Sequence, residues 1–73
     1  MSEQRIVNYA MQCGAVWAGL ENLALHKDRK GVAIFFADEH DAQEFSFYAQ
    51  DWLHDEGYSC KITRDEEFVL IWL

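Results

Sequence analysis

The sequence predicts a single small α+β domain with the element order α-β-α-β-β, in which two helices pack on a three-stranded sheet. Three observations lead to this prediction: apolar residues recur at helical spacing near the N-terminus, residues 31–37 form a continuous apolar run, and residues 58–73 contain two strand-like segments separated by a charged turn. A chain of 73 residues has room for one domain, residues 1–73, and its 51% of hydrophobic residues is enough for a core.

A first helix is expected to begin after Ser2, its N-cap, and to extend to about Leu25 or Lys27. The residues of its main apolar stripe alternate three and four apart: Ile6, Tyr9, Cys13, Val16, Leu20 and Leu23. A second apolar set lies largely on the other side, so the helix would be apolar nearly all round. Such a helix needs burial on more than one side, and we therefore expect Val7, Met11 and Leu25 to form a homodimer interface.

Small residues in the same segment have two interpretations. Ala10, Gly14 and Ala18 form a line at i, i+4 spacing that would let another backbone approach closely. Gly14 and Gly19 could equally relieve crowding against the protein's own sheet. The sequence leaves both interpretations open.

Residues 31–37 predict a strand covered on both faces, because the run is continuous and rich in β-forming residues. Asp38 then predicts the N-cap of a second helix that ends near Glu56, with Gly57 at the C′ position. Phe47 should point to solvent. The inner face of this helix is expected to consist of Ala42, Phe45, Tyr48, Ala49, Trp52 and Leu53.

Residues 58–63 alternate apolar and polar, as in a half-exposed strand, and residues 68–73 form another apolar strand. A crossover through the second helix would make the first two strands parallel, and the apolar last strand should lie between them, which gives the order second-third-first (2-3-1). The last strand presents Phe68, Leu70 and Trp72 on one face. If both helices pack on the opposite face of the sheet, the face with Phe68, Leu70 and Trp72 would be covered by homodimerisation. Alternatively, the first helix covers that face within one chain.

The sequence contains no recognisable catalytic or phosphate-binding motif, so we expect neither an enzyme nor a bound cofactor. His40 with Glu44, and His54 with Asp51, are spaced as ligand pairs on one helix. A tight metal site needs three or four ligands, and we therefore expect no metal.

The compartment is inferred from the cysteines and from the hydropathy pattern. Cys13 and Cys60 lie in apolar contexts and form no closely spaced pair, which is typical of buried, reduced thiols. The N-terminus lacks the apolar run of a secretory signal, and no stretch reaches the roughly 18 apolar residues of a membrane span. We expect a cytoplasmic protein with no membrane partner.

The net charge of −7 lies in one segment of the chain. Residues 38–56 contain seven acidic residues and no Lys or Arg, while six basic residues match the six acidic residues elsewhere. Glu44, Asp51 and Asp55 line one side of the second helix, and Asp55 lies in its last turn, where the macrodipole disfavours anions. We expect this side, with Phe47 as an apolar anchor, to bind a protein partner with a basic surface and not to bind nucleic acid directly.

In size, acidity and absence of a catalytic motif, the chain resembles the small phage-encoded inhibitors of host machinery, including anti-CRISPR and DNA-mimic proteins. This resemblance implies a non-enzymatic inhibitor or modulator of a larger basic or nucleic-acid-binding complex. Two other functions stay open. One is a structural or regulatory homodimer, and the other is a small-ligand-binding domain with a pocket lined by Tyr9, Trp17, Tyr48 and Trp52.

Overall fold

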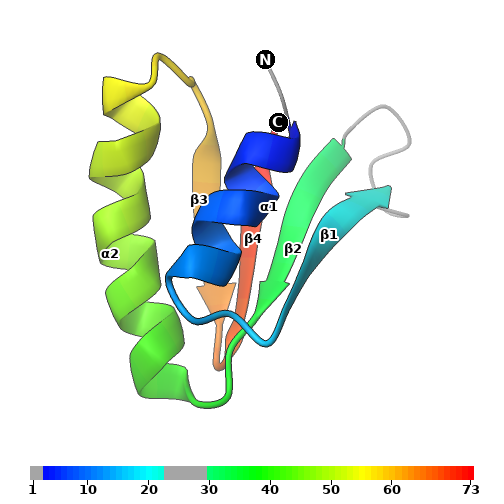
Figure 1. The fold of residues 1–73 in the computed structure, drawn as a ribbon, viewed down its shortest axis with the longest axis vertical. Helices are drawn as coiled ribbons and strands as arrows, with labels where there is room; N and C mark the ends of the chain where they lie inside the picture. Colours follow the sequence, from blue (N-terminus) through cyan, green and yellow to red (C-terminus); the bar gives the residue numbers. More distant parts are fainter. Residues whose placement is uncertain (1–2, 23–29) are drawn as a thin grey trace.

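The computed structural model describes residues 3–22 and 30–73, which fold into two layers (Figure 1). One layer is a sheet, and the other consists of two helices that lie over the same face of it. In chain order the elements are α1 (Glu3–Gln12), β1 (Trp17–Asn22), β2 (Lys30–Phe35), α2 (Glu39–Asp55), β3 (Lys61–Asp65) and β4 (Phe68–Trp72). The predicted α+β class is confirmed, and none of the described helices is long and apolar enough to cross a membrane.

Within the described residues the sheet has four strands and not the predicted three, in the order β1-β2-β4-β3. Each neighbouring pair is antiparallel, so β2 and β3 run parallel to each other on either side of β4. The three predicted strands therefore stand in the predicted order, with the last strand in the middle. The prediction was wrong for residues 17–22, which form the edge strand β1 and not the second half of a helix.

Helix α1 ends at Gln12, well short of the predicted end. Gly14 follows with a φ of +95°, a left-handed conformation that glycine adopts without steric cost. The Ala15 N–H donates to the Ala10 carbonyl, and the Gly14 N–H donates to the Met11 carbonyl, each at 3.1 Å. These two bonds form the Schellman motif that ends helices, and the chain then turns into β1.

Helix α2 has the boundaries that its capping residues predict. Asp38 is the N-cap, and its side chain accepts a hydrogen bond from the Asp41 N–H at 2.8 Å. At the other end Gly57 has a φ of +82°, and the Tyr58 N–H donates to the Leu53 carbonyl at 2.9 Å. This is a second Schellman motif, again with glycine at the C′ position.

The hydrophobic core lies between the sheet and the helices. Alternate residues of the two central strands point into it, and four of them are almost completely buried: Val32, Ile34, Val69 and Ile71. Burying one such side chain contributes about 1.5–3 kcal/mol, so these residues supply much of the energy that holds the two layers together. Helix α1 adds Ile6 and Ala10 to the same cluster.

Helix α2 buries four of the six residues predicted for its inner face: Ala42, Phe45, Ala49 and Leu53. Trp52 is half-buried and stacks on Tyr9, with ring centroids 4.1 Å apart. Tyr48 is 57% exposed, so its predicted place on the inner face was wrong. It lies at the margin of the buried stripe, beside the end of α1, where Cys13 and Tyr48 line a shallow depression. Cys13, predicted to be buried, is exposed because the helix ends before it.

No described helix covers the sheet surface opposite α1 and α2, and we call this surface the open face (Figure 1). The strand register arranges its residues in three cross-strand rows. The first row is Trp17, Phe35, Phe68 and Asp65, the second is Gly19, Ala33, Leu70 and Thr63, and the third contains Gly31, Trp72 and Lys61. The face of β4 that carries Phe68, Leu70 and Trp72 is therefore the one that both helices leave open.

A tight turn at residues 66–67 joins β3 to β4. Glu66 has a φ of +54°, and this left-handed conformation costs a non-glycine residue about 1–2 kcal/mol. The Arg64 guanidinium donates to the Glu66 carbonyl at 3.1 Å and to the Glu39 carboxylate at 3.4 Å. Arg64 therefore ties the strained turn to the first turn of α2.

Candidate functional site

The four residues predicted to bind a partner lie together on the outer side of α2, and we call this surface the α2 strip: Glu44, Phe47, Asp51 and Asp55. Helical spacings of three, four and seven place them on one side of the helix, and each of them is exposed. They lie opposite the buried stripe of the same helix. The α2 strip is therefore accessible to another molecule without any change in the fold.

The carboxylates of the α2 strip differ in their ion pairing from two other acidic residues at the ends of the helix. At the margins of α2, two other acids are paired within the chain: Arg5 contacts Glu56 at 2.9 Å and Arg64 contacts Glu39 at 3.4 Å. The three carboxylates of the strip form no ion pair with any described residue. Their field therefore extends into solvent over the screening length of about 8 Å at physiological salt.

Phe47 is the most exposed large hydrophobic residue in the described part of the chain, at 69%. Tyr48 contacts it edge to face, with ring centroids 5.6 Å apart. Shallow depressions flank the pair, one lined by His40 and Phe47 and the other by Cys13 and Tyr48, and Glu44 lines both. Tyr48 therefore belongs to this surface. Sequence reasoning missed it, although the tyrosine hydroxyl, which favours a partly wet position, was an available signal.

The residues predicted to form a dimer interface, Val7, Met11 and Leu25, were assigned to a longer helix than the structure contains. Val7 is half-buried and packs against the protein's own core, whereas Met11 is exposed. Leu25 lies outside the described residues. Val7 and Met11 both lie on α1, which ends at Gln12.

The open face carries a row of aromatic side chains in mutual contact. Trp17 and Phe35 are 45% and 41% exposed, with ring centroids 5.9 Å apart, and Phe68 lies 4.8 Å from Phe35. Exposed apolar surface of this kind marks sites of association when it is contiguous. Sequence reasoning found Phe68 but not its two neighbours in the row.

Two tryptophans of the open face contact other residues of the sheet. The indole of Trp17 covers Gly19, where an added Cβ would lie 2.8 Å from Cζ2 of the ring. The Nε1–H of Trp72 donates to the Thr63 hydroxyl on the neighbouring strand at 3.1 Å. Both rings are thereby held close to neighbouring residues of the sheet.

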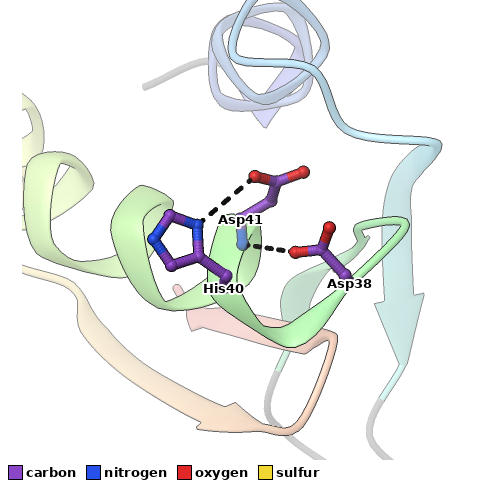
Figure 2. A group of neighbouring side chains, drawn as sticks. All are labelled: Asp38, His40 and Asp41. Carbon is purple, nitrogen blue, oxygen red and sulfur yellow. Dashed lines mark hydrogen bonds and ion pairs between the residues drawn. The ribbon is translucent and has the colours of Figure 1, made fainter.

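Three potential metal ligands gather at the start of α2 (Figure 2). Ligand atoms of Asp38, His40 and Asp41 lie within 4.8 Å of one another, and all three residues are exposed. The sequence had suggested different pairs, His40 with Glu44 and His54 with Asp51. In Figure 2, Asp38 binds the Asp41 N–H as the N-cap, and the Asp41 carboxylate lies 3.8 Å from Nδ1 of His40. Helix capping therefore accounts for the position of Asp38.

The aromatic residues proposed for a ligand pocket do not surround one cavity. Tyr9 and Trp52 stack in the helix layer, Tyr48 is exposed beside Phe47, and Trp17 lies on the open face. Burial, followed by the nearby Cys13 thiol, raises the pKa of Tyr9 to about 12. This phenol therefore stays neutral at physiological pH.

Cys60 is half-buried and packs against the core beside β3. Burial raises the pKa of its thiol, which makes it a poor nucleophile.

Comparison of the chain with protein-family models, with curated proteins and with solved structures found no match. The function is therefore inferred from the surfaces described above.

Proposed function

We propose that this chain is a non-enzymatic protein-binding module that engages a basic surface of a larger protein through the α2 strip. The observation that carries the proposal is the combination of an exposed Phe47 with three carboxylates that no described residue neutralises. An apolar anchor at the centre of a contact supplies most of the binding energy, whereas charges at its rim set the association rate and the salt dependence. The strip offers both.

The kind of partner follows from the sign and length of the charge. The row of negative charge is about 16 Å long at 1.5 Å per residue, from Glu44 through Asp51 to Asp55. A nucleic acid backbone carries charge of the same sign. Proteins that bind nucleic acid present basic surfaces to it, so we propose such a complex as the partner and its inhibition or modulation as the effect. This proposal implies a cytoplasmic protein that does not itself bind nucleic acid.

The experiment compares two double variants that change net charge equally. Glu44→Lys with Asp51→Lys alters the α2 strip, and Glu66→Lys with Glu67→Lys alters the β3–β4 turn as the matched control. Each protein, checked for folding by circular dichroism, is used for affinity capture from the native host. The captured partner is then measured by surface plasmon resonance. We expect the strip variant to associate at least tenfold more slowly and with a weaker salt dependence, and the control to bind like the wild type.

Phe47→Ala separates the anchor from the charges. We expect it to speed dissociation of the captured partner by about tenfold or more, as truncation of an aromatic hot spot does. The association rate should stay within about twofold, because the charges are unchanged. If the strip variant and Phe47→Ala both bind like the wild type, the α2 strip is not the binding surface.

A homodimer is the second candidate function, and the open face is the observation that favours it. Trp17 and Phe35 are exposed there as part of a contiguous aromatic row. Association through this face would leave the α2 strip free, so the two functions are compatible.

A further inference from the structure

We propose that two copies of this chain stack their open faces together, with each strand antiparallel to the same strand of the other copy. The inference deepens the second candidate function, homodimerisation, and does not depend on the α2 strip. The partner on the open face is a second copy of this chain, because the rows of the face complement one another in charge and in shape when one copy is turned over.

The arrangement is defined by a two-fold axis that lies between the two sheets and runs parallel to the cross-strand rows. Such an axis places β3 over β3 and β4 over β4 of the second copy, with the strand direction reversed. The first row of one copy then faces the third row of the other, and the second row faces itself. An isologous contact of this kind closes after two subunits.

Charge complementarity comes from the edge strand β3. Lys61 and Asp65 point to the same face at opposite ends of the strand. At about 3.4 Å per residue they stand roughly 14 Å apart, too far to pair within one chain. In the antiparallel stack, each Lys61 lies over Asp65 of the second copy, so two opposite-charge pairs form at the rim of the interface.

Shape complementarity comes from the two central strands. Phe35 of the first row lies over Gly31 of the second copy, so that the largest projection on β2 meets the position without a side chain. An axis parallel to the strands would instead place Phe35 over Phe68 of the second copy and Trp17 over Asp65, which wedges the sheets apart at one end.

The size of the face limits the arrangement. Four strands of five or six residues, at about 4.8 Å per strand and about 3.4 Å per residue, cover roughly 400 Å², which is half of the roughly 800 Å² per partner that a standard-size interface buries. The stack therefore has to use the open face over its full extent, as the row-on-row arrangement does.

The test uses charge reversal and charge exchange at one pair of positions, with sedimentation equilibrium as the readout. Lys61→Asp alone and Asp65→Lys alone each place like charges opposite one another twice per dimer. We expect either change to raise the dissociation constant of the dimer about tenfold. The double variant, with Lys61→Asp and Asp65→Lys together, restores two opposite-charge pairs and should return within about threefold of the wild type. Glu67→Lys, in the same hairpin but outside the rows, is the matched control and should change nothing.

Three outcomes overturn the proposal. The wild type stays a monomer at high concentration, or it forms a dimer that neither single reversal weakens, or both reversals weaken the dimer and the double variant fails to restore it. The last two results leave a homodimer with a different arrangement. None of the three bears on the α2 strip, whose variants are measured against another protein.

Discussion

Replacing Gly14 by alanine tests where α1 ends, because the two possible conformations of this residue predict opposite effects on stability. Gly14 has a φ of +95°, and nothing lies within 4 Å of the position that a Cβ would occupy. The cost of a side chain therefore comes from the backbone conformation, which is about 1–2 kcal/mol for an L-residue in the left-handed region. Alanine offsets up to about 1 kcal/mol of this, because it loses less backbone entropy than glycine on folding. We expect a net loss of about 1 kcal/mol.

A helix that continued through residue 14 would give the opposite sign. There, Gly14→Ala would raise the free energy of unfolding by about 1 kcal/mol through helix propensity. Urea denaturation followed by circular dichroism separates the two results, and a loss of about 1 kcal/mol corresponds to a Tm lower by about 4–8 °C in a domain of this size. Gly14→Asn is the control, because Asn tolerates the left-handed conformation, and it should stay closer to the wild type. An alanine variant more stable than the wild type would refute the assigned end of α1.

Ile34→Ala should lower the free energy of unfolding by about 2–5 kcal/mol, because Ile34 is completely buried, whereas Phe47→Ala should change it by at most about 0.5 kcal/mol. Urea denaturation measures both, and equal losses would contradict the placement of Phe47 on the surface. The pKa of Tyr9, raised from 10.0 to about 12, means that the folded state holds this proton more tightly than the unfolded chain does. Stability should therefore fall as the pH rises from 10 to 12, and Tyr9→Phe should remove that part of the fall in denaturation curves measured against pH. Glu66→Gly should raise the free energy of unfolding by about 0.5–1 kcal/mol, because glycine adopts the left-handed turn conformation without steric cost. A lower value in the same urea assay would show that the Glu66 side chain stabilises the turn by more than its strain costs.

Helix α2 could be predicted closely because the signals at both of its ends are local. Asp38 and Gly57 cap the helix with bonds to residues three to five positions away, and such bonds depend on nearby sequence alone. Gly14 occupies the same position in the same motif at the end of α1. It was not predicted to end the helix because Val16 and Leu20 continue the three-and-four spacing by coincidence, although Val16 immediately precedes β1 and Leu20 lies within it. Periodicity counts apolar positions and does not detect the break between them.

The α2 strip was predictable for the same reason: once the helix is placed, its periodicity decides which residues face solvent. The open face was predictable only on β4, where alternation assigns Phe68 and its neighbours to one side. The aromatic row also needs Trp17 and Phe35, which lie beside Phe68 only through strand pairings that are distant in sequence. Register of this kind depends on the whole sheet and cannot be read from any one segment.

The contact between Trp17 and Gly19 limits which residue types these two positions can carry together. An added Cβ at residue 19 would lie 2.8 and 2.9 Å from two atoms of the indole, so a side chain there has to lift the ring off the sheet. A chain that retains this fold can therefore vary position 19 only if position 17 becomes smaller or turns outward. We expect residues 17 and 19 to change together in related sequences, as a covarying pair on a single strand.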